Sequence, residues 1–382
     1  LCLIALNFYW RSGLLCVLQM QMQKRHFKLA LVAVWMIAVS GVFDFFGYEI
    51  DEFNSSVRLF LRSGKTDIRL FDEKGIPLSF SARSGEKFIS PFYVIHYGLI
   101  YSEVTQGREE RVGLHWREDS SVKYWNVNPS VVKEEYFRFA ADWVVDNLVE
   151  FKGQKHLLYN FDWEYRNYPN GKLTAPWWSG LSDAYAIVLL LRAYDVYGEK
   201  KYFAAASDLY LSVLAPVTLG GSLLELNGLP WIEEYVDPNA APGEMSKVLN
   251  GMVYAYYGIN AFEKHSKGFG ASGASLEKSI VKNFETFSLG RWSLYDSIGN
   301  AANIKYHRIH FGLLSDFVGE GRGSLDELLE KWAIGVRHSG FFWILNSNWS
   351  YAKLHFLFSW IFVLLFGVAA INRMLASRAT AA

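Results

Sequence analysis

The chain has 382 residues, and its 38 basic and 38 acidic side chains cancel, which excludes the strong positive field typical of nucleic-acid-binding proteins. Hydrophobic residues make up 51% and aromatic residues 17%, so membrane segments, aromatic binding clefts or both are expected. Both cysteines, Cys2 and Cys16, lie near the start. The rest of the chain therefore has neither a cysteine nucleophile nor a cysteine-ligated metal.

Two apolar segments stand near the ends of the chain. The first, residues 29–43, follows a basic cluster, and the second, residues 354–371, precedes Arg373 and Arg378. Because basic flanks stay in the cytoplasm, these patterns predict a signal sequence or a signal anchor within an N-terminal extension, 1–47, and a C-terminal transmembrane helix. The part between them would then be membrane-anchored and extracytoplasmic, in a periplasm, an extracellular space or a lumen. Two buried core helices are the alternative interpretation.

In the section between these segments, the spacing of the apolar residues changes near residue 129. Residues 48–128 hold short alternating runs and turn signals, which predicts a small β-rich region. Residues 129–345 show helical spacing instead. The expected helices include 182–197 with Gly198 as the stop, 200–214, 245–264, 275–287 and one that opens with the capping box Ser324-x-x-Glu327. This succession favours a mainly α fold, an incomplete (α/α) toroid with a central cleft and a small N-terminal β region.

An aromatic loop, residues 159–180, is the first candidate binding feature. Loops are usually polar because they run over the surface, yet this one contains Trp163, Trp177 and Trp178 beside other aromatic residues. Exposed aromatic faces suit the C–H faces of sugar rings, so these three tryptophans are candidate substrate-binding residues. Rings that only plug the centre of the toroid are the structural alternative.

Two further stretches carry polar side chains that could take part in catalysis or binding. Residues 230–238 place two carboxylates beside a phenol, although paired acidic residues in loops are usually only solvated. Residues 291–310 end in Tyr306-His307-Arg308-Ile309-His310. Two histidines three residues apart can ligate a metal, but no third histidine or carboxylate ligand stands near them in sequence. A structural or substrate-bonding role is therefore favoured for His307 and His310.

Signatures of other chemistries are missing or stand in the wrong context. Residues 268–273 match Gly-x-Gly-x-x-Gly, but they follow a helical stretch instead of a strand, so a flexible linker is expected. The chain has no Gly-x-Ser-x-Gly, P-loop or His-Glu-x-x-His motif. Acyl transfer on a nucleophile elbow, phosphoryl transfer and zinc proteolysis thus lack their sequence signatures. Neither a cofactor nor a resident metal is expected.

Several short motifs follow one another in the helical section, and their identity and order carry a family resemblance. They are Trp178-Ser179-Gly180-Leu181, Leu190-Leu191-Arg192-Ala193-Tyr194, Glu233-Glu234-Tyr235, Val248-Leu249-Asn250-Gly251, Tyr295-Asp296 and Tyr306-His307-x-x-His310. From about residue 91 to 314 the chain resembles the C-terminal domain of the D-glucuronyl C5-epimerases, isomerases that convert D-glucuronate to L-iduronate in heparosan-type or heparan-type chains. The resemblance implies a uronate-containing, heparosan-like polysaccharide as substrate. It also implies an active site lined by Glu234, Tyr235, Tyr295 and Tyr306.

The epimerase chemistry accounts for these residue types. Removal of the C5 proton adds negative charge beside an existing carboxylate, and inversion needs a proton from the opposite face of the sugar. Glu234 and Tyr306 are the expected acid–base pair, with the order of their roles left open, and Tyr235 and Tyr295 are expected to bond to the developing charge. The other expected substrate-binding residues are Asn250, Arg291, His307, Arg308 and His310.

This chain departs from the family pattern near the expected carboxylate-binding position. Where the family commonly has an arginine after Tyr-Asp, the chain continues as Ser297-Ile298-Gly299. The cation for the substrate carboxylate is therefore expected from Arg291, Lys305 or Arg308. Two other functions stay open, namely a polysaccharide lyase that expels the C4 substituent after the same proton abstraction and a non-catalytic, membrane-anchored glycan-binding protein. A homodimer also stays open, and no nucleic-acid partner is expected.

Overall fold

The computed structural model describes residues 70–73, 75–80, 86–106, 133–266, 268–270, 272–315 and 323–346, with a few isolated positions after 360. The expected signal anchor lies outside these residues, as does the expected C-terminal membrane helix apart from isolated positions. Within the described ranges, no helix combines the length and the apolar character needed to cross a membrane.

The chain divides into two compact units, and the larger one ends at residue 336. The short helix α12 (Ser339–Asn346) belongs to the other unit. The helices that make up the larger unit are α3 (Pro91–Gln106), α5 (Lys133–Asp146), α6 (Gly180–Tyr197), α7 (Lys200–Leu214), α8 (Leu249–His265), α9 (Ser272–Asn283), α10 (Ile304–Ser315) and nearly all of α11 (Gly323–Arg337).

The strands of the larger unit are short and pair antiparallel in four small sheets. They are β1 (Leu70–Phe71), β2 (Pro77–Phe80) and β3 (Lys87–Ile89); β4 (Leu148–Phe151), β5 (Gln154–Tyr159) and β8 (Trp177–Trp178); β6 (Trp163–Glu164) with β7 (Lys172–Leu173); and β9 (Leu223–Leu226) with β10 (Leu229–Ile232). The mainly helical fold with small sheets expected from the sequence is confirmed.

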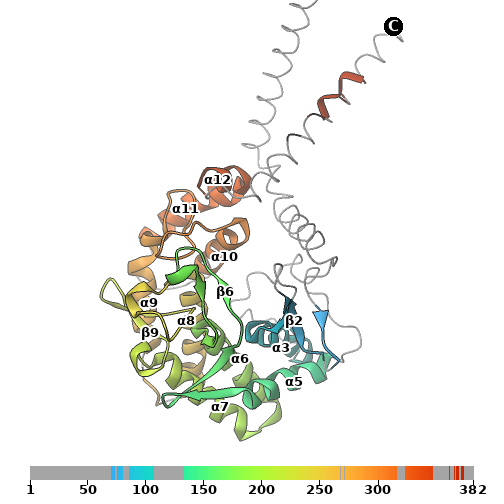
Figure 1. The fold of residues 1–382 in the computed structure, drawn as a ribbon, viewed down its shortest axis with the longest axis vertical. Coiled ribbons are helices and arrows are strands. Elements are labelled where there is room, and N and C mark those ends of the chain that lie inside the picture. The colour runs from blue at the N-terminus through green and yellow to red at the C-terminus, as the bar shows by residue number, and fades with distance from the viewer. Residues whose placement is uncertain are drawn as a thin grey trace, which may run out of the picture. The chain divides into compact units, whose positions relative to one another are not determined.

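Helix α6 is the central element of the larger unit, and it packs against α3, α7 and α8, as Figure 1 also shows. It is apolar on nearly all sides, which is typical of a helix surrounded by other helices. It begins after Ser179, whose hydroxyl accepts the Ser182 N–H, and it ends at Gly198 in the left-handed conformation, φ 69°. The predicted helices 182–197 and 200–214 are thus confirmed.

The predicted β-rich region, 48–128, is wrong for residues 91–106, which form helix α3. Strands β1 to β3 precede the helix as expected. The helix is buried almost all round, so its apolar residues show no helical period, and a run of this kind cannot be told from a buried strand by pattern alone. Another predicted helix, 245–264, begins at Leu249 because Pro242–Glu244 forms a short 3₁₀ turn before it.

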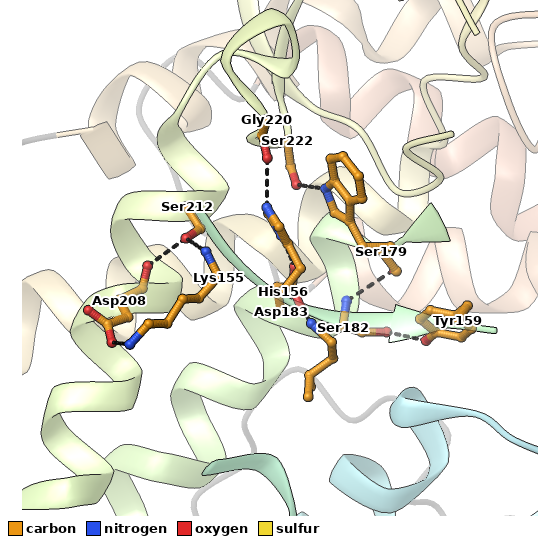
Figure 2. A network of polar contacts seen from close by, with 12 residues as sticks. Lys155, His156, Tyr159, Ser179, Ser182, Asp183, Asp208, Ser212, Gly220 and Ser222 are labelled. Carbon is orange, nitrogen blue, oxygen red and sulfur yellow. Dashed lines mark hydrogen bonds and ion pairs between the residues drawn. The ribbon is translucent and has the colours of Figure 1, made fainter. Parts of the chain in front are cut away.

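A buried polar network joins β5, the first turn of α6 and the loop before β9 (Figure 2). His156 stands at its centre, with Nδ1 2.8 Å from Asp183 Oδ2 and Nε2 2.7 Å from the carbonyl oxygen of Gly220. Asp183 Oδ1 accepts the Leu157 N–H, and both the His156 and Asp183 side chains are fully buried. A carbonyl oxygen only accepts, so Nε2 carries a proton, and a second proton is shared between Nδ1 and the carboxyl group.

The same network fixes the segment that follows β10. Trp178 stacks on His156, with ring centroids 4.5 Å apart, and its indole N–H donates to Ser222 Oγ. The Trp178 backbone exchanges two hydrogen bonds with Val236, and the Ser222 carbonyl accepts the Glu233 N–H. The buried network therefore sets the position of residues 233–236, which hold the central part of the candidate site.

Candidate active site

Glu233 anchors the segment after β10 from within the protein. Its buried carboxylate accepts hydrogen bonds from Ser246 Oγ at 2.7 Å, from the Lys247 N–H at 2.8 Å and from the Tyr235 N–H at 3.1 Å. With all three bonds engaged, Glu233 ties its own segment to the loop before α8. The chain bends at Glu234, whose side chain lies within hydrogen-bond distance of Asn250 at the start of α8.

Glu234 is a nearly buried carboxyl group, 7% exposed, beside the start of α8. Its Oε2 accepts a hydrogen bond of 3.3 Å from Asn250 Nδ2. Gly251 packs directly under it, because a Cβ atom at that position would lie 2.5 Å from Oε2. Burial raises the pKa of Glu234 to about 8, and the charge of Glu233 adds to this, while a hydrogen bond from Tyr235 opposes it. Glu234 is therefore suited to take and return a proton near neutral pH.

Three tyrosines expected at the site come together beside this carboxyl group. The hydroxyl oxygens of Tyr235 and Tyr295 are 2.8 Å apart, and the rings of Tyr295 and Tyr306 have centroids 4.6 Å apart. Burial raises the pKa of both Tyr235 and Tyr295 well above the usual value, and the charge of Glu234 raises both further. These two phenols stay protonated at neutral pH and can donate hydrogen bonds to a developing negative charge.

Aromatic residues of the 159–180 loop pack behind the tyrosines. Tyr165 donates to Asp296 Oδ2 at 2.6 Å, and its ring centroid is 5.2 Å from that of Tyr235. Trp177 stacks on Tyr159 at 4.1 Å and meets the Tyr235 ring edge-on. The loop thus supplies a wall that holds the Tyr235 ring in place.

The structure separates the three tryptophans expected to bind substrate. Trp163 on β6 is exposed, at 44%, and can meet a ligand. Trp177 is buried in the wall just described. Trp178 lies in the core against His156 and is 2% exposed, which argues against direct contact with a substrate. The position of an aromatic residue in a loop therefore does not establish that its side chain is exposed.

The two histidines of α10 lie behind the site, fully buried. His310 Nε2 is 3.2 Å from Asn250 Oδ1, and the Nδ1 atoms of His310 and His307 lie 2.9 Å and 3.0 Å from one hydroxyl, Ser293 Oγ. Burial lowers the pKa of His307 to about 3 and that of His310 well below its usual value. Both rings are neutral at physiological pH, and their burial argues against the predicted direct contact with substrate.

The cationic candidates differ in their relation to the tyrosines. Arg291 is exposed, and Arg308 is half-buried on α10. The ammonium of Lys305 lies 5.9 Å from the centroid of the Tyr306 ring.

The sequence did not indicate the roles of Ser293 and Gly251 at the site, because a single serine or glycine has no recognisable pattern until its partners are known.

Comparison with known proteins relates the segment that holds this site to one family. Residues 152–332, which hold all four tyrosine and glutamate residues of the site, match the family model described as D-glucuronyl C5-epimerase C-terminus. This segment is therefore similar to the C-terminal part of the D-glucuronyl C5-epimerases. The resemblance drawn from the sequence is thereby confirmed.

Two curated relatives extend the comparison. The D-glucuronyl C5-epimerase of Caenorhabditis elegans is 27% identical over 245 residues, which are 58% of this chain and 38% of the relative. An uncharacterized protein of Methanocaldococcus jannaschii is 29% identical over 160 residues, 40% of this chain and 48% of the relative. The chain thus spans less than half the length of these two relatives.

Solved structures show only a distant likeness. An endo-β-1,4-glucanase of family GH8 from an Achatina fulica gut metagenomic library has a TM-score of 0.39 at 13% identity, covering 73% of this chain and 75% of that one. A GH76 α-mannanase of Bacteroides thetaiotaomicron has a TM-score of 0.38 at 11% identity, covering 89% and 87%.

Proposed function

We propose that the protein is an isomerase that inverts C5 of D-glucuronate residues in a heparosan-like polysaccharide, yielding L-iduronate. One observation carries the proposal, namely that a buried carboxyl group with a pKa of about 8, Glu234, stands beside the Tyr235–Tyr295 pair. The match of residues 152–332 to the D-glucuronyl C5-epimerase family model supports the same reaction.

Proton abstraction is assigned to Glu234 and reprotonation to Tyr306. Glu234 in its ionised form takes the C5 proton, and the electron pair of the broken C–H bond moves toward the uronate carboxylate. Tyr306 returns a proton to the opposite face of C5, which inverts the centre. Tyr235 and Tyr295 donate hydrogen bonds to the carboxylate as its charge grows, and removal of one such donor typically costs about 10²–10³ in rate.

Lys305 is proposed as the cation that pairs with the substrate carboxylate. Its charged group lies over the ring of a proposed catalytic residue, Tyr306. A cation at this place stabilises the dianionic intermediate more than the monoanionic substrate, which is what lowers a barrier. Trp163, exposed beside the site wall, is proposed to stack on a neighbouring sugar of the polymer.

The surroundings of the site belong to the same proposal. The helices are proposed to form an incomplete (α/α) toroid whose loops face the polymer. The apolar segments 29–43 and 354–371 support membrane anchoring with the catalytic part outside the cytoplasm.

The proposal is tested by incubating the full chain with heparosan in heavy water and following C5 of the uronate by NMR. Deuterium at C5 together with iduronate signals is expected, and both signals should be lost in Glu234→Gln and Tyr306→Phe. An unsaturated uronate product that absorbs in the ultraviolet would instead identify a lyase. Binding without any C5 exchange, in the wild type and in both variants, would identify a non-catalytic glycan-binding protein.

A further inference from the structure

A continuous row of buried side chains leads from Glu234 to the centre of α10. Asn250 Nδ2 lies 3.3 Å from Glu234 Oε2, and Asn250 Oδ1 lies 3.2 Å from His310 Nε2. Ser293 Oγ then bridges the Nδ1 atoms of His310 and His307, at 2.9 Å and 3.0 Å. The exposed fraction is 4% for Asn250 and 0% for Ser293 and both histidines, so water does not compete for these bonds.

Proton counting restricts how this row can be arranged. A neutral imidazole has one N–H and one lone pair, and a hydroxyl has one proton to donate. Because one Ser293 hydroxyl meets two Nδ1 atoms, it donates to one ring and accepts from the other, and the two histidines are opposite tautomers.

One of the two arrangements suits an ionised Glu234. In it, the Asn250 amide donates to the carboxylate, so its carbonyl accepts from Nε2–H of His310. His310 Nδ1 then accepts the Ser293 proton, and His307 donates its Nδ1–H to Ser293. In the other arrangement the amide is turned over and presents its carbonyl oxygen to Glu234, which requires a protonated carboxyl group.

We propose that Ser293, His307 and His310 are positioning residues that hold the Asn250 amide with its N–H toward Glu234. The row thereby stabilises the ionised form of the base without touching the sugar. Other titratable groups around Glu234 are Glu233 and Tyr235 on its own segment, Tyr254 on α8, Tyr306 on α10, and Tyr165 and Tyr295 from the loops. Burial raises the pKa of Tyr235, Tyr254, Tyr165 and Tyr295, so these phenols stay neutral across the range in which Glu234 titrates.

Ser293→Ala tests this inference by kinetics and by titration. Only the kinetic test rests on the proposed function. Loss of the bridge frees the amide to turn, and loss of one donor to a carboxylate should raise the apparent pKa of Glu234 by about 1. The kcat/KM value should then fall about tenfold at pH 7 and return to the wild-type value above pH 10. Infrared titration of the substrate-free full chain, assigned with Glu234→Gln, should show the same displacement.

A matched control is Ser279→Ala, which removes another fully buried hydroxyl, on α9, outside the row. It should leave the titration of Glu234 in place. Should the alanine variant of Ser293 not fold, Ser293→Cys keeps the volume and weakens the bridge, and it should give the same displacement. An unchanged Glu234 titration, or an equal loss of kcat/KM at every pH, would overturn the inference. If the Glu234 titration is displaced but the protein does not act on heparosan, the inference holds and heparosan is excluded as the substrate.

Discussion

Two buried polar clusters in this molecule contain histidine and a carboxyl group, yet their bonding differs. In the first, both ring nitrogens of His156 face acceptors and both oxygens of Asp183 have donors, at 2.7–3.1 Å. In the second, the carboxyl group of Glu234 accepts from the Asn250 amide at 3.3 Å and from the Tyr235 side chain, and the histidines lie further back. The first cluster holds the fold, whereas the carboxyl group of Glu234, which lies beside the tyrosines, is available for chemistry.

Glu234→Gln should separate activity from stability most clearly. Removal of a general base typically costs about 10²–10⁴ in rate, so C5 exchange should fall by a factor in that range. The activity of the wild type should rise with pH through about 8, because the base must be ionised.

The stability change of the same variant should have the opposite sign. Burial raises the pKa of Glu234 from 4.5 to about 8, so folding favours the neutral form, and ionisation progressively destabilises the protein as pH rises between those values. The substituted amide does not ionise, hence the variant should be more stable than wild type by roughly 3–5 kcal/mol at pH 9 and about equal at pH 4. Urea unfolding at both pH values measures this, and a variant less stable at pH 9 would contradict it.

Asp183→Asn should show the reverse pattern in the first cluster. Removal of one partner of a buried pair leaves the other without compensation and costs about 3–5 kcal/mol. Denaturant unfolding should show this loss, while C5 exchange per folded molecule should stay near the wild-type value at low temperature. A loss below about 1 kcal/mol would mean that the His156–Asp183 pair does not hold α6 to β5.

Gly251→Ala should disturb the second cluster without removing any functional group. The added methyl group would overlap Glu234 Oε2 and Cβ, at 2.5 Å and 2.6 Å, so the carboxyl group must move. Misplacement of a reacting group by about 1 Å can cost roughly 100-fold in rate. Gly243→Ala, where a Cβ meets nothing within 4 Å, is the matched control and should keep full activity. Equal activity of the two variants would show that the position of Glu234 tolerates displacement.

The sequence predicted the parts of this molecule that are encoded locally. The helices at 182–197 and 200–214 were found because an apolar run ends at a glycine stop, and the second follows at once. Helix α3 was missed because burial on all sides removes its period, and α10 because its Tyr-His-x-x-His residues were considered only as side chains.

The residues of the site could be predicted from the sequence, but the residues that hold them in place could not. Glu234, Tyr235, Tyr295 and Tyr306 were named through the family resemblance, and the structure brings them together. The bridge from Asn250 to Ser293 through His310 joins residues dozens of positions apart, and no local pattern encodes such contacts. The anchoring role of Glu233 could not be predicted either, because the sequence does not show which of two adjacent glutamates faces the site.

The smallest effect is expected at the edge of the first cluster, where Lys155 pairs with Asp208 at 2.6 Å (Figure 2). These side chains are 42% and 39% exposed, so water competes with the pair, and exposed pairs typically contribute about 0.2–1 kcal/mol. Asp208→Asn should therefore lower the free energy of unfolding by less than about 1 kcal/mol, and added salt should reduce the difference further. A loss as large as that of Asp183→Asn would mean that position in the network, not burial, decides what a charge contributes here, and the contrast between the two clusters would fail.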